Sequence, residues 1–93
     1  MHIRFYLDPE SREPHLHRHH VTETEAEEVL QRPVEDRAGR DGSRVAIGQT
    51  RNGRYLRVIY VADPEPDSVF VITALELGAK ALRALKRRRK KKQ

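Results

Sequence analysis

Apolar and polar residues alternate along residues 2–7, a period of two that predicts a half-buried strand. The residues expected to face the core are Ile3, Phe5 and Leu7. Asp8 and Pro9 end this strand. A helix that started at Pro9 would contain Pro14, which would clash with the preceding turn. We therefore expect a turn and then a short helix that restarts at Pro14.

The segment "TETEAEEVLQRP", residues 22–33, has the pattern of a capped amphipathic helix. Thr22 and Glu25 have the spacing of a capping box, and Pro33 limits the far end. Its inward stripe is expected to be Ala26, Val29 and Leu30. The polar, glycine-containing residues 34–43 that follow predict a loop.

Residues 44–62 predict a β-hairpin, with "RVAIGQT" and "YLRVIYVA" on either side of "RNGR". Asn-Gly favours a two-residue type I′ turn, which fixes the strand register. That register places one set of pairs on the core face: Gln49 with Leu56, Ile47 with Val58, and Val45 with Tyr60. Arg57 then lies on the other face, across from Gly48 and beside open space.

Residues 69–75, "VFVITAL", are apolar on both faces and predict a central strand. A final helix is expected from about Leu77, with an inward face of Gly78, Ala81, Leu82 and Leu85. Lys80, Arg83 and Arg87 line its opposite face. No apolar residue follows Leu85, so residues 86–93 are expected to be a frayed tail behind a single domain of residues 1–85.

The net charge of +5 is concentrated at this tail, because residues 86–92 alone carry seven positive charges. The remaining body is therefore close to −2. Such a tail neutralises phosphates by releasing their counterions, or it matches the dipole at a helix end.

The composition excludes several classes of protein. Cysteine is absent, which excludes disulfides and thiolate metal sites. No apolar run is long enough to span a bilayer, and residues 1–20 lack the apolar centre of a secretory signal, so we expect a cytoplasmic protein with no membrane contact. A chain of 93 residues buries a small core, which leaves a homodimer open.

The segment "PHLHRHHV", residues 14–21, holds four of the five histidines. On a helix, His15 and His19 share one face, whereas His17 and His20 share another. Two faces cannot close around one ion, and no nearby carboxylate has a recognisable zinc-site spacing. We expect no metal at this cluster.

The order of these elements resembles the small RelE/ParE-like toxins, and the chain resembles more specifically the BrnT ribonuclease toxins of bacterial toxin–antitoxin pairs and related domains of unknown function. The likeness covers roughly residues 4–76. It is carried by "FYLDP", by "RHHV" with "TETEAEEVL", by "RVAIGQT" with "GRYLRVIY", and by "VITA".

This resemblance implies a small α+β RelE-like fold with an N-terminal strand, two helical segments, a three-stranded antiparallel meander and a C-terminal helix. It also implies an endoribonuclease that acts on mRNA without a cofactor, inhibits translation and is silenced by a cognate antitoxin protein. His19 falls on the family histidine. Cleavage needs an acid, a base and cations, and our preferred catalytic set is His19, Arg57 and Arg83. The expected RNA-binding residues are Arg44, Arg54, Lys80, Arg87 and Tyr55.

The chain also departs from the family pattern. Ser11 stands where a lysine is common, Leu75 where an arginine is usual, and the last helix lacks its usual tyrosine-containing ending. His20 replaces a glycine, which indicates either an unusual backbone angle or a helix that runs one residue further. The alternative is therefore a catalytically decayed relative that binds nucleic acid or protein. Each preferred residue also has an ordinary structural explanation: a partly buried helix histidine, an outward strand arginine or a solvated helix face.

Overall fold

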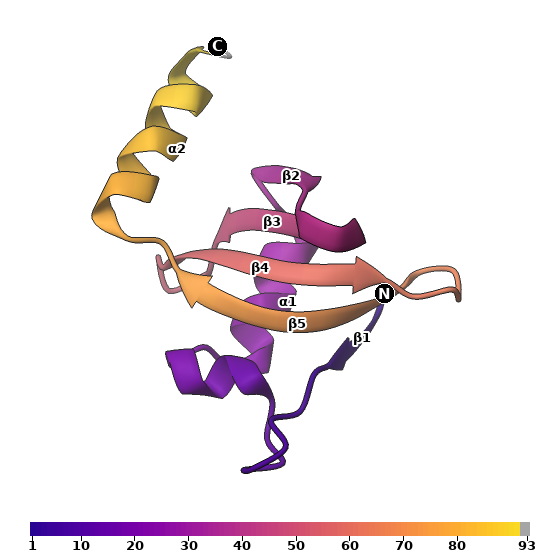
Figure 1. Ribbon diagram of the computed structural model, residues 1–93. Coiled ribbons are helices and arrows are strands. Elements are labelled where there is room, and N and C mark those ends of the chain that lie inside the picture. The colour runs from indigo at the N-terminus through magenta and orange to yellow at the C-terminus, as the bar shows by residue number, and fades with distance from the viewer. Residues whose placement is uncertain (92–93) are drawn as a thin grey trace.

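The computed structural model describes residues 1–91 of the chain, which form one α+β unit (Figure 1). The elements in chain order are β1 (His2–Phe5), η1 (His15–His19), α1 (Glu23–Gln31), β2 (Glu35–Ala38), η2 (Arg40–Gly42), β3 (Arg44–Gln49), β4 (Tyr55–Ala62), β5 (Ser68–Glu76) and α2 (Ala79–Lys91). The two short η elements are 3₁₀ helices. No helix within residues 1–91 is both long and apolar enough to cross a membrane.

The five strands form one mixed sheet in the order β1-β5-β4-β3-β2. β1 pairs parallel with β5, and all other neighbours are antiparallel. An α+β architecture is thus confirmed, but the expected three-stranded meander has a fourth strand, β2. The expected loop at residues 34–43 is therefore wrong.

β2 was not visible in the hydrophobic pattern because polar contacts hold this edge strand. Asp36 accepts hydrogen bonds from Arg44 and from the hydroxyl of Tyr60, and Glu35 accepts two from Arg88. Charged residues are common on edge strands, where they discourage pairing with other chains. Alternation of apolar residues is therefore a weak signal for such a strand.

The hairpin register differs from the expected one by one residue. Gly48 pairs with Leu56 and Ala46 with Val58, so Arg57 lies opposite Ile47 rather than Gly48. The loop has three residues, 51–53, and Gly53 adopts a φ of 94°. This is a common alternative to the two-residue turn, with glycine at the left-handed position. The extra loop residue inverts the faces of β3 but leaves those of β4 as expected.

One face of the sheet carries the core. Leu56, Val58 and Ala74 are completely buried there against Ala26 and Val29 of α1. A Cβ on Gly48 would lie 3.2 Å from Val29 Cγ1, so α1 packs almost directly on the backbone of β3. Figure 1 shows α1 behind the sheet, and no helix lies in front of the middle of β4 and β5.

The N-terminal segment confirms most expectations. Ile3 and Phe5 pack against the core, but Leu7 is 52 % exposed, because the strand ends at Phe5 and the chain then forms a bridge between Leu7 and Pro14. The short helix restarts after Pro14 as expected. It ends at His20, whose φ of 59° and ψ of 37° are left-handed, the conformation in which glycine costs least.

α2 extends away from the body at the end of β5 (Figure 1). Leu85 is buried, Ala81 and Leu82 are half-buried, and Lys80, Arg83 and Arg87 are exposed, as expected. Gly78 was expected on the inward face, but it is exposed and precedes the helix, which begins at Ala79. The helix continues through Lys91, although the sequence predicts a frayed tail from residue 86. Two contacts hold this extension in place: Arg88 donates two hydrogen bonds to Glu35, and Arg89 donates one to the carbonyl of Val34. Residues 92–93 of the expected tail lie outside the described residues.

The capping box of α1 is present as expected, and its glutamate is also a partner of the hairpin. Glu25 accepts a hydrogen bond from the backbone N–H of Thr22 and two from Arg54 Nη1, at 2.8 and 2.9 Å. Burial by itself raises the pKa of Glu25, but the bonds from Thr22, Arg54 and Asn52 outweigh it, and the net pKa is lowered. The folded state therefore favours the ionised carboxylate.

We expect Glu25→Gln to lower the free energy of unfolding at pH 7 by about 2 to 3 kcal/mol, because charge-assisted hydrogen bonds are lost in a buried place. Because folding lowers the pKa of Glu25, its carboxylate stabilises the folded state above pH 4.5, the ordinary value. This contribution is lost as the pH falls below 4.5. The difference between wild type and variant should therefore narrow below pH 4.5. Urea denaturation across the pH range measures this, with Glu27→Gln as the control on the same helix. A difference in unfolding free energy between wild type and Glu25→Gln that does not change with pH would contradict this prediction.

Candidate nucleic-acid interface

The side of the sheet away from α1 is only half covered. We call its centre the open face, defined by four half-buried residues on β4 and β5: Arg57, Ile59, Thr73 and Leu75. In the observed register Arg57 is opposite Leu75 and Ile59 is opposite Thr73, so all four side chains point to the same side. The sequence predicted the position of Arg57 on this face, and the structure confirms it.

Arg57 has an unsatisfied donor on the open face. Its Nε is buried and has no hydrogen-bond partner within the described chain, and the hydroxyl of Thr73 is in the same state. Apolar residues flank the arginine in register, Ile47 on β3 and Leu75 on β5. A buried N–H without a partner costs about 1 to 3 kcal/mol, and such groups are few in folded proteins. Arg57 as a whole is only half-buried, so an anion on the open face would reach the other nitrogens of its guanidinium.

Three cations line the exposed side of α2. The side chains of Lys80, Arg83 and Arg87 form no hydrogen bond or ion pair with the described part of the chain. Their spacing along the helix places them on one stripe. This stripe is available for contacts with phosphate groups, as expected from the sequence.

Two of the expected RNA-binding arginines are instead engaged within the protein. Arg54 is paired with Glu25 and Glu76 and donates to the carbonyl of His20. Hydrogen bonds to Glu25 are the main cause of the raised pKa of Arg54, although burial opposes it. Arg44 donates to Asp36 from the core side of the sheet, away from Arg57. Both arginines therefore have structural roles that account for their positions.

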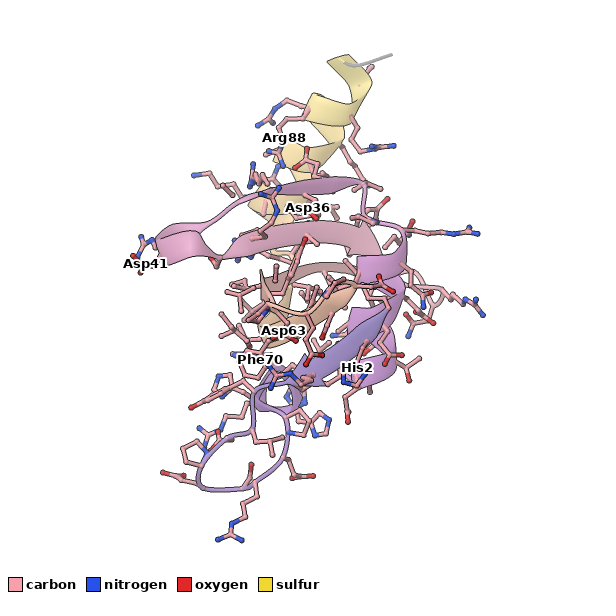
Figure 2. The ribbon with its side chains drawn as sticks, turned by 90° about the vertical axis from the view of Figure 1, so that its right-hand side faces the viewer. His2, Asp36, Asp41, Asp63, Phe70 and Arg88 are labelled. Atoms are coloured by element: carbon pink, nitrogen blue, oxygen red, sulfur yellow. The ribbon has the colours of Figure 1, made fainter. Side chains whose placement is uncertain are left out.

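The four clustered histidines separate into different environments. The rings of His15 and His19 pack edge to face at 5.5 Å, which confirms their shared side of the helix. His15 also lies near Tyr6, which packs against Phe70 at the β1 edge of the sheet, where Figure 2 labels Phe70. His19 thus lies beside His15 on η1, the segment that packs against β5.

His17 has a structural contact that the sequence did not reveal. Its Nε2 lies 2.6 Å from Glu23 Oε1, and this contact connects η1 to the first turn of α1. The same hydrogen bond is the main cause of the lowered pKa of Glu23. Within residues 1–91, no group of three or more His, Cys, Asp or Glu side chains is arranged to hold a metal ion.

The structure does not join the three preferred catalytic residues to one another. Arg57 is central on the open face, Arg83 is on the exposed stripe of α2, and His19 is on η1, which packs against β5. No hydrogen bond or ion pair in the described range connects any two of them. A substrate that contacts all three elements would be needed for these residues to act together.

No protein-family model, curated protein or solved structure matches this chain. The assignment of a site therefore depends on the chemistry of its side chains. On that basis the open face and the cationic stripe of α2 are the strongest features for binding an anionic polymer.

Sequence reasoning missed Thr73 and the helical structure of residues 86–91, although it expected the cations of this segment to bind phosphates. Leu75 and Thr73 are two residues apart on β5, so alternation alone places them on one side of the sheet. What the sequence does not fix is the register between β4 and β5, which places Arg57 on that same side.

A pair of substitutions separates the two kinds of arginine. We expect Arg54→Leu to lower the free energy of unfolding by about 2 to 3 kcal/mol, because it leaves Glu25 buried without its cation. Arg57→Leu should change it by less than about 1 kcal/mol, or increase it, because an unsatisfied donor is removed from apolar surroundings. Urea denaturation of both variants checks this. An equal loss of unfolding free energy in the Arg54→Leu and Arg57→Leu variants would show that Arg57 also has a structural role.

Proposed function

We propose that the chain is a RelE-like endoribonuclease of the BrnT toxin type, which cleaves mRNA across its open face and is held inactive by a cognate antitoxin. One observation carries the proposal: Arg57 points from the middle of the sheet with a buried donor that no described residue satisfies. The resemblance of the sequence motifs supports the same function. The basic stripe on α2 gives the polymer a second place to bind.

RNA cleavage of this kind needs no metal. The 2′-oxygen attacks the adjacent phosphorus and loses its proton to a base, while the 5′-oxygen leaves and gains a proton from an acid. His19 is the candidate for one of these proton transfers, because an imidazole titrates near neutral pH. Arg57 would stabilise the negative charge that develops on the phosphate oxygens, with hydrogen bonds that strengthen in its apolar surroundings. Arg83 would hold a neighbouring phosphate.

We expect His19→Ala to slow RNA cleavage by about 10² to 10⁴-fold and Arg57→Ala by about 10² to 10³-fold. Expression of wild type without a partner protein should arrest growth, and either variant should relieve the arrest. The measurement is RNA integrity over time with purified protein, together with growth after induction.

His2→Ala and Arg37→Ala are the matched controls, because they remove a histidine from β1 and an arginine from β2. Wild type that leaves RNA intact and does not affect growth would exclude the ribonuclease. An effect of the controls equal to that of His19→Ala and Arg57→Ala would contradict the assigned residues.

A second function is favoured because no contact among the described residues joins His19 to Arg57 or Arg83. A decayed relative would bind RNA through Arg57 and the α2 stripe without cleaving it, and would need no aligned histidine. Its binding should survive His19→Ala. Replacement of Lys80, Arg83 and Arg87 by Gln should reduce the slope of log affinity against log salt by about 2, because three phosphate contacts on a single strand are lost. Binding that needs His19 but is unchanged by the triple replacement would exclude this alternative.

A further inference from the structure

A cavity of about 240 Å³ lies between α2 and the beginning of β4. It is lined by Tyr55, Leu85, Lys86, Arg89 and Lys90, and none of these residues is acidic. Leu85 forms a buried apolar wall, and Tyr55 is half-buried. The cavity therefore combines an aromatic ring, an aliphatic wall and three cations.

The positive charges at this cavity are not neutralised by the carboxylates of residues 1–90. Arg88 of the same helix is paired with Glu35, through bonds of 2.9 and 3.0 Å, and Figure 2 labels it where α2 passes β2. Lys86, Arg89 and Lys90, by contrast, form no ion pair with a described carboxylate, and the guanidinium of Arg89 donates to the carbonyl of Val34. The positive field at the cavity therefore remains available to a ligand.

These features point to a ligand with a flat aromatic part and an anionic part. We propose that the cavity is a nucleotide subsite, in which a base stacks on the ring of Tyr55 and its phosphate is bound by Lys86 and Lys90. Stacking on a tyrosine accepts every base, because each base has a π-face. An acidic peptide would use the cations but would leave the ring and the aliphatic wall without a partner.

The subsite lies next to Arg57. Tyr55 and Arg57 are two residues apart on β4, so their side chains point to the same side of the sheet from Cα atoms about 6.6 Å apart. The position of this subsite along the RNA rests on the proposed function. If Arg57 binds one phosphate of a single RNA strand, the neighbouring nucleotide is within reach of Tyr55. The subsite would then orient the substrate and set its affinity, without a role in the chemical step.

The test is a titration with adenosine 5′-monophosphate, monitored by the ring resonances of Tyr55 and the amides of residues 85–90 in NMR spectra. Binding should shift these signals, and it should be at least about fivefold weaker in Tyr55→Leu, as expected for a lost stacking partner. Tyr55→Phe should retain the affinity, which excludes a general loss of structure. Lys86→Gln should weaken binding, whereas Arg40→Gln and Tyr6→Leu, which change a cation and a ring outside the cavity, should not.

Several results would overturn the subsite. They are failure of the nucleotide to bind, equal binding by inorganic phosphate alone, equal binding by a hexaglutamate peptide, or affinity that is unchanged in Tyr55→Leu. None of these depends on RNA cleavage. If the nucleotide binds as expected but RNA is never cleaved, the subsite stands and the ribonuclease fails. If RNA is cleaved but no nucleotide binds at Tyr55, the ribonuclease stands and the subsite fails.

Discussion

The buried pair of Glu25 and Arg54 connects four parts of the chain that lie far apart in the sequence. The carboxylate caps α1 and accepts from the hairpin loop, while the guanidinium also reaches the carbonyl of His20 and the carboxylate of Glu76. A buried carboxylate left without its cation is costly, so these contacts favour the arrangement in which all four segments meet. That arrangement holds α1 against a single face of the sheet and leaves the opposite face without a helix at its centre.

This division also separates the cations by role. The arginines near the carboxylates of α1, β2 and β5 are neutralised inside the protein, as Arg54, Arg44 and Arg88 show. Those on the open face and on the exposed stripe of α2 have no described acidic partner. A net charge of +5 therefore understates the positive potential of this surface, because most of the negative charge lies among the internal pairs. Association with an anionic polymer would be directed to one side of the molecule.

Local signals in the sequence predicted the local features well. The capping box at Thr22, the proline-started helix before His20 and the outward position of Arg57 all depend on residues a few positions apart. The features that were missed depend on distant partners. The strand β2 needs Arg44, Tyr60 and Arg88, and the extension of α2 needs Glu35 and Val34. Asn-Gly is compatible with hairpin loops of two or three residues, and the packing of Gly48 against α1 is consistent with only one of the two registers.

That one-residue difference bears directly on the candidate site. With the two-residue turn, Arg57 would have Gly48 beside it and its guanidinium would be open to water. In the observed register Ile47 and Leu75 flank it, and its Nε is buried. Apolar surroundings strengthen a charged hydrogen bond and at the same time raise the cost of removing water from an anion. An isolated anion would gain little from such a place. If a polymer bound as proposed, its contacts with the α2 stripe and with Tyr55 would offset this cost for the phosphate at Arg57. The proposal therefore predicts that a long anionic ligand binds at Arg57 in preference to a free ion.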